Sequence, residues 1–126
     1  MSIEVVATDN APSAIGPYSQ AIIHGSLIYS SGQIPINPAT GNIEASAIEE
    51  QAQQVLENLK HVLEAAGSNM SKVIKTTVFI KNMGDFPKVN EVYSKYFIAP
   101  YPARSCVEVS KLPKDVLIEI EAVAYK

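Results

Sequence analysis

The chain has 126 residues, of which 47% are hydrophobic and 18% charged, and its net charge is −3. A chain of this composition can bury a hydrophobic core and is not intrinsically disordered. The length is that of one domain spanning residues 1–126. No basic run occurs, since the densest lysine cluster holds only Lys111 and Lys114. A nucleic-acid partner is therefore not expected.

The single cysteine, Cys106, excludes an intrachain disulfide and suits a reducing compartment. No apolar run approaches the length of a membrane span, so no membrane association is expected. The first ten residues carry neither an arginine-rich presequence nor an apolar core with a cleavage site. We therefore expect a cytoplasmic protein.

The first quarter of the chain predicts strands separated by loops. Ile3 to Ala7 is a short apolar run typical of a strand, and Ala11 to Pro17 holds two prolines and a glycine, typical of an ordered loop. Ser19–His24 and Leu27–Ser31 are two further strand-like runs. Gly25 and Ser26 join them, and a glycine-first two-residue turn predicts a tight hairpin.

A long helix is predicted after a proline-rich loop that ends near Asn42. Ser46 and Glu49 form a capping-box pattern, in which each side chain would accept from a free backbone N–H. From Ile48 to Ala66 apolar residues recur at steps of three and four, which gives one apolar stripe. Gly67 follows, where a left-handed residue commonly ends a helix.

The second half predicts a strand, a helix and two more strands. Val73–Lys81 alternates, with Ile74, Thr76, Val78 and Ile80 expected on one face. A helix should run from Phe86 to Phe97 with Asp85 as its cap, followed by strands at Ala103–Val109 and Val116–Tyr125. This order predicts an α+β sandwich, in which two helices pack on one face of a mixed sheet and the other face needs a partner.

Metal and nucleotide chemistry find no support in the sequence. It contains no CxxC pair, HExxH, Walker-type loop or dinucleotide fingerprint. His24 and His61 have no companions at metal-ligand spacing. We expect no metal and no cofactor.

The stretch Pro102–Val109 is the most informative for chemistry. On a strand, Arg104, Cys106 and Glu108 would share a face, and a surface Arg–Glu pair is the interpretation this stretch favours by itself. Arg104 is also placed to offer its planar fork to a carboxylate. Cys106 could be a nucleophile, but a small half-buried side chain is the preferred interpretation.

A carboxylate pair lies on the last predicted strand. Ile118 and Ile120 should face the core, so Glu119 and Glu121 should face the opposite way. Such carboxylates are usually only solvated. Glu119 becomes a candidate for chemistry if another subunit covers this face.

Several segments together resemble the reactive-intermediate deaminase family, also known as YjgF-like proteins and as perchloric-acid-soluble ribonucleases. The resemblance covers nearly the whole chain. The segments that carry it occur in the family's order: Ala14–Ala21, Ser30–Pro35, Lys75–Ile80, Asp85-Phe86 with Val89-Asn90, Pro102–Val109 and Ile118–Ala122. The resemblance implies a chorismate-mutase-like α+β fold and a homotrimer with a ligand cleft at each subunit interface.

The resemblance also implies a set of site residues. The family arginine that binds the substrate carboxylate corresponds to Arg104, and the glutamate that orients the attacking water corresponds to Glu119. Tyr101 belongs to a connection whose length varies among relatives, and it is expected beside the cleft. The substrate-binding positions, with Cys106 contributing mainly through its backbone, correspond to Tyr18, Ser31, Gly32, Asn90, Arg104 and Cys106.

The activity implied by the resemblance is that of a 2-iminobutanoate/2-iminopropanoate deaminase. Such an enzyme hydrolyses imines and enamines formed by amino-acid dehydration to 2-keto acids and ammonia. Two alternatives remain open. One is a regulator that binds a carboxylate metabolite in the same cleft without turnover. The other is a ribonuclease or translation inhibitor, which the acidic balance disfavours.

Overall fold

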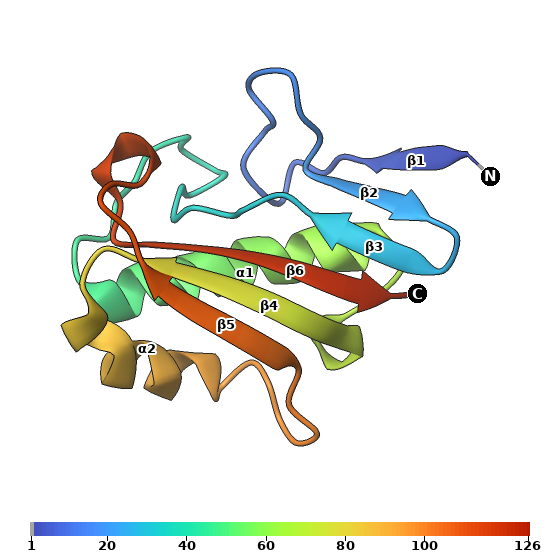
Figure 1. The fold of residues 1–126 in the computed structure, drawn as a ribbon. Helices are drawn as coiled ribbons and strands as arrows, with labels where there is room; N and C mark the ends of the chain where they lie inside the picture. The colour runs from blue at the N-terminus through green and yellow to red at the C-terminus, as the bar shows by residue number, and fades with distance from the viewer. Residues whose placement is uncertain (1) are drawn as a thin grey trace.

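The computed structural model describes residues 2–126 and contains one mixed sheet covered by two helices. The sheet order is β1-β2-β3-β6-β4-β5, and every neighbouring pair is antiparallel except β4 with β5. Both helices lie on the same face of the sheet (Figure 1). The predicted α+β sandwich is confirmed. The strands are β1 (Ile3–Val6), β2 (Ala21–His24), β3 (Leu27–Ser30), β4 (Val73–Ile80), β5 (Ala103–Glu108) and β6 (Ile118–Tyr125), and the helices are α1 (Ile48–Ala65) and α2 (Phe86–Tyr93).

The hairpin between β2 and β3 is confirmed. His24 pairs with Leu27, so Gly25 and Ser26 alone form the turn. Gly25 has a φ of 63°, a left-handed conformation that glycine adopts without a Cβ clash.

Helix α1 lays its apolar stripe against the sheet, where Val55, Leu56, Leu59, Val62 and Leu63 are fully buried. Burying this stripe is the main source of the helix's stability, because helices in proteins are stabilised mostly by the packing of an amphipathic face. Gly67 follows the helix with a φ of +83°, as predicted.

The predicted capping box at the start of α1 is wrong. The N-cap is Ala47, which has no side chain to accept a hydrogen bond. Ser46 therefore lies one residue too early and Glu49 one residue too close to the cap for their reciprocal bonds. The Gln51 side chain fixes the N-terminal end of α1 instead. Its amide donates to the Ala45 carbonyl at 3.0 Å and accepts from the Leu117 N–H at 2.8 Å.

Helix α2 is shorter than predicted and ends at Tyr93 rather than Phe97. The next residues form turns in which the N–H groups of Tyr96 and Phe97 donate to the Tyr93 carbonyl, and the Tyr93 and Phe97 rings pack at a tilt of 37° with centroids 4.5 Å apart. Asp85 is the N-cap as predicted, but its side chain makes no capping bond, because a 3-10 turn at Met83–Asp85 runs directly into the helix.

One residue of β4 departs from the predicted alternation. Thr76, Val78 and Ile80 are fully buried, whereas Ile74 is 45% exposed. The register between β4 and β6 shifts between Val73 and Lys75, which takes Ile74 out of phase with the rest of the strand. The prediction that Ile74 shares the buried face is wrong for this reason.

The face of the sheet away from the helices keeps large side chains in solvent. Tyr29, Val107 and Tyr125 are each 43% or 44% exposed. An exposed apolar face of this kind is typical of a surface that a partner covers. No helix within residues 2–126 is long and apolar enough to cross a membrane.

Candidate functional site

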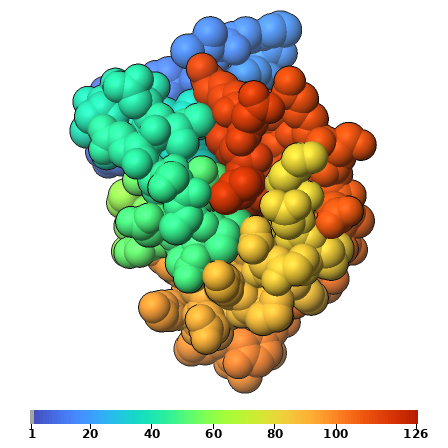
Figure 2. Space-filling model, turned by 90° about the vertical axis from the view of Figure 1, so that its left-hand side faces the viewer, coloured from blue at the N-terminus to red at the C-terminus, as the bar shows by residue number. Residues whose placement is uncertain are grey.

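Glu119 lies on the open face of the sheet, between two residues whose side chains are fully buried on the other face, Ile118 and Ile120. It lines a pocket of about 540 Å³ at one end of the molecule. Three loops make the walls, from residues 12–20, 31–36 and 113–114. Figure 2 shows segments of the first quarter of the chain and of the stretch before β6 meeting at this end.

Gly32 lies directly against the Glu119 side chain. The segment around it extends β3 along β6, because Gln33 and Ile120 exchange backbone hydrogen bonds of 2.8 and 3.1 Å. A Cβ added to Gly32 would clash with the Glu119 carboxylate and would lie 2.7 Å from its Cδ. Only glycine lets the carboxylate occupy this position.

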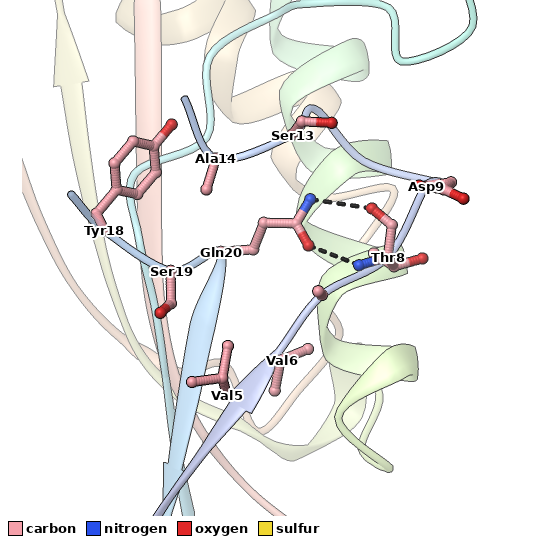
Figure 3. Close-up of a pocket in the computed structure, with 10 residues that line it drawn as sticks. Val5, Val6, Thr8, Asp9, Ser13, Ala14, Tyr18, Ser19 and Gln20 are labelled. Atoms are coloured by element: carbon pink, nitrogen blue, oxygen red, sulfur yellow. Dashed lines mark hydrogen bonds between the residues drawn. The ribbon is translucent and has the colours of Figure 1, made fainter. Parts of the chain in front are cut away.

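Tyr18 and Ser31 also line the Glu119 pocket. The Ser31 hydroxyl donates to the Ser19 carbonyl at 2.6 Å, which fastens the loop that carries Tyr18. The buried Gln20 amide bonds to both the N–H and the carbonyl of Thr8, at 2.7 and 3.0 Å (Figure 3). Tyr18, 53% exposed, thus stands on a loop held at several points and lines the Glu119 pocket.

The environment of Glu119 favours its protonated form. Burial raises the pKa of its carboxyl above the usual 4.5, and the neighbouring negative charge of Glu121 raises this pKa further. A carboxyl whose pKa is moved toward neutrality can both accept and return a proton.

Arg104 lies on β5 on the other face of the sheet, toward α2. Its Nη1 donates to the Asn90 Oδ1 at 2.8 Å. The guanidinium carbon is 5.0 Å from the centroid of the Phe86 ring and 4.8 Å from that of the Tyr93 ring. Arg104 and Asn90 line a pocket of about 420 Å³, together with Tyr101, which borders the arginine as expected.

The guanidinium has no carboxylate partner among the residues that the structure describes. The surface Arg104–Glu108 pair that the strand pattern favoured does not form, because Glu108 Oε1 accepts from the Met83 N–H at 2.8 Å instead. A half-buried cation without a counter-charge, facing a pocket, is suited to an anionic ligand.

Cys106 lies on the same face as Arg104 and packs partly against the core. Burial raises the pKa of its thiol above the usual 9.0, although the Arg104 charge acts to lower this pKa. The thiol is therefore protonated at neutral pH, which favours the half-buried side chain over the nucleophile.

The structure does not bring the two candidate catalytic residues together. Glu119, Tyr18, Ser31 and Gly32 surround one pocket on the open face, whereas Arg104, Asn90 and Cys106 lie on the helix face. The sheet separates them. One small substrate cannot touch both Arg104 and Glu119 of the same chain.

Sequence reasoning missed three residues in or beside these pockets: Tyr93 lines the Arg104 pocket, Phe86 contacts Arg104, and Lys114 lines the Glu119 pocket. Phe86 and Tyr93 flank Arg104, and their helical spacing is the signal that could have found them. Lys114 lines the Glu119 pocket with a left-handed φ of 56°, which no sequence pattern marked. Within residues 2–126 no three His, Cys, Asp or Glu side chains are grouped as metal ligands would be.

Comparison with known proteins identifies the family. The family model described as Endoribonuclease L-PSP matches residues 8–126. The chain belongs to this family. Among its relatives, a RutC family protein from Pyrococcus horikoshii is 60% identical, with 98% of each chain covered. The 2-iminobutanoate/2-iminopropanoate deaminase of Escherichia coli is 52% identical, again with 98% of each covered.

A solved structure gives the same result for the fold of this L-PSP family member. The Yersinia pestis protein YyfA, of the conserved Rid protein family, superimposes with a TM-score of 0.97 and is 52% identical, over 99% of this chain and 100% of that one. The predicted resemblance to the reactive-intermediate deaminase family is confirmed, and so is the fold that it implied.

Proposed function

We propose that this protein is a 2-iminobutanoate/2-iminopropanoate deaminase, which hydrolyses reactive imines of 2-amino acids to 2-keto acids and ammonia. The observation that carries the proposal is the half-buried Arg104 guanidinium, which faces a pocket and has no carboxylate partner in the described chain. The relatives named as deaminases support the same activity.

Arg104 binds the carboxylate of the imino acid. One of its N–H groups is engaged by Asn90, and the remaining donors of the fork are available for a bidentate grip. This grip fixes the imine carbon relative to the protein, which lowers the entropic part of the barrier.

The complete site forms between two copies of the chain in a homotrimer. Arg104 and Glu119 lie on opposite faces of one sheet, and a second copy covering the open face would bring its own Arg104 to the Glu119 pocket. The exposed apolar side chains of this face, including Tyr29 and Tyr125, give such an interface surface to bury. Residues 1–126 act as one catalytic domain in this assembly.

Glu119 orients the water and moves protons. Its carboxylate accepts a proton from the water as the oxygen adds to the imine carbon, and the Glu119 carboxyl then gives this proton to the imine nitrogen, which yields a carbinolamine. Glu119 next takes the proton of the carbinolamine hydroxyl and passes it to the amine nitrogen, the carbon–nitrogen bond breaks, ammonia leaves, and the hydroxyl oxygen becomes the carbonyl of the 2-keto acid. Water and imine supply every atom, so no cofactor or metal is required.

The other site residues shape the pocket around these two. Gly32 leaves room for the Glu119 carboxylate, and Ser31 holds the loop that carries Tyr18. Asn90 orients Arg104, and Cys106, two residues further along β5, contributes to substrate binding mainly through its backbone. We place the reaction in the cytoplasm, where a single cysteine stays reduced and amino-acid dehydration supplies the substrate.

A coupled assay tests the proposal. A dehydratase acting on serine or threonine generates the imine, and keto-acid release is followed with the wild type and with Arg104→Ala. Faster release with the wild type alone supports an imine deaminase anchored by Arg104. No acceleration by either protein overturns the proposal and leaves a metabolite-binding regulator, for which binding without turnover is the distinguishing result.

A further inference from the structure

Helix α2 presents three side chains to Arg104. Phe86, Asn90 and Tyr93 are four and three residues apart, so they lie on one face of the helix. The two rings lie 5.0 and 4.8 Å from the guanidinium carbon, and Asn90 accepts from its Nη1 at 2.8 Å. We propose that Phe86 and Tyr93 are positioning residues that hold Arg104 ready for the substrate carboxylate. This inference rests on the proposed function.

The Tyr93 ring is itself fixed from two sides. Its hydroxyl makes a 2.7 Å hydrogen bond with the Thr76 hydroxyl, which is fully buried on β4. Its ring packs against the Phe97 ring at a tilt of 37°, with centroids 4.5 Å apart. Since Tyr93 is only 6% exposed, it cannot swing away without breaking both contacts. The surface that Arg104 lies against is therefore rigid.

Aromatic rings suit this task better than a carboxylate would. A ring face attracts a cation through its quadrupole and occupies none of its N–H donors. A carboxylate partner would take the donors that the substrate needs. The rings and Asn90 can thus fix the guanidinium while most of its fork stays free.

A fixed guanidinium also reduces the cost of binding. A mobile arginine loses side-chain freedom when it grips a ligand, and this loss weakens the affinity. Arg104, held in advance, has already lost that freedom. Removing a ring should weaken carboxylate binding, and the effect should disappear when Arg104 is absent.

The test measures binding of 2-oxobutanoate, a stable keto acid, to the full-length assembled protein by titration calorimetry. Tyr93→Leu is expected to raise Kd by about 2- to 30-fold, as loss of a cation–π contact of this kind implies. Tyr93→Phe keeps the ring and should retain most of the affinity. Tyr96→Leu is the matched control, since the Tyr96 hydroxyl donates to Glu57 rather than contacting Arg104.

A double-mutant cycle separates positioning from a general structural role. In the Arg104→Ala background, Tyr93→Leu should cause no further loss of affinity. An equal loss in both backgrounds, or an unchanged Kd in Tyr93→Leu, overturns the inference. Phe86→Leu repeats the cycle at a less buried position if Tyr93→Leu does not fold.

The same titrations distinguish this inference from the proposed function. If Arg104→Ala binds 2-oxobutanoate as tightly as the wild type, the carboxylate anchor of the proposed function is wrong. If Arg104→Ala loses binding while both ring variants bind normally, only the positioning role is wrong.

Discussion

Gly32→Ala tests the contact on which the Glu119 position depends. The added Cβ would lie 2.7 Å from the Glu119 Cδ and 3.0 Å from its Cγ. Carbon atoms in contact are normally about 3.5–4.0 Å apart, so the carboxyl group must withdraw by about 1 Å. A displacement of this size in a catalytic group can reduce the rate by about 100-fold.

The fold should tolerate this substitution. The Gly32 backbone is not in the left-handed region, and the atoms that must move belong to the end of a flexible side chain. We expect the free energy of unfolding to change by less than about 1 kcal/mol, since alanine also restricts the unfolded chain. Urea denaturation measures this quantity, and the coupled keto-acid assay measures the rate.

Gly84→Ala is the matched control. A Cβ at Gly84 would meet no atom within 4 Å, so neither rate nor stability should change appreciably. In the Glu119→Gln background, Gly32→Ala should cause no further loss of rate, because it acts through that carboxylate. If Gly32→Ala alone keeps nearly full activity, the observed position of Glu119 is not the one used in catalysis.

Two further predictions concern Glu119 and Gln20. Folding raises the pKa of Glu119 through burial and Glu121, so its protonated form stabilises the fold at low pH and this contribution is lost as the pH rises through the raised pKa. Glu119→Gln should therefore raise the melting temperature at neutral pH while abolishing activity. As the pH is lowered, the rate of the wild type should begin to fall at a higher pH than it would with a glutamate of ordinary pKa. Gln20→Leu removes the bonds to Thr8 and should lower the free energy of unfolding in urea by about 1–3 kcal/mol, whereas an unchanged value would show that these bonds contribute nothing.

Local patterns predicted most of the fold because they depend on near neighbours in the chain. The Gly25-Ser26 turn and the apolar stripe of α1 each follow from a few residues and one period. The predictions that were wrong concern features that tertiary contacts determine. Gln51 replaced the capping box by reaching the Leu117 N–H, and the register shift beside Val73 displaced Ile74.

In the candidate site, too, some features follow from local sequence and others depend on tertiary contacts. The resemblance supplied the residue types, and strand alternation placed Glu119 on the open face. The contact between Gly32 and Glu119 joins residues far apart in sequence, and it depends on the pairing of Gln33 with Ile120. That Arg104 faces α2 follows only from the parallel pairing of β5 with β4, which aligns Arg104 with the buried Thr76. No single-strand pattern contains that register.

The separation of Arg104 from Glu119 makes a quantitative prediction for mixed assemblies. Arg104→Ala and Glu119→Gln chains are unfolded together in equal amounts and refolded, so that they assemble at random. If each site takes Arg104 from one chain and Glu119 from another, half of the arginines and half of the glutamates are intact, and about one quarter of the sites regain both. If each site used both residues of one chain, every site would carry a defect and no activity would return.

Mixing wild type with the double variant Arg104→Ala/Glu119→Gln provides the complementary measurement. A site shared between two chains again leaves about one quarter of the sites intact, whereas a site within one chain leaves about one half. The coupled keto-acid assay distinguishes the two fractions. Because the first mixture gains activity and the second loses it under the shared arrangement, a fault in refolding cannot imitate both results. Recovery near zero in the first mixture and near one half in the second would refute the shared site.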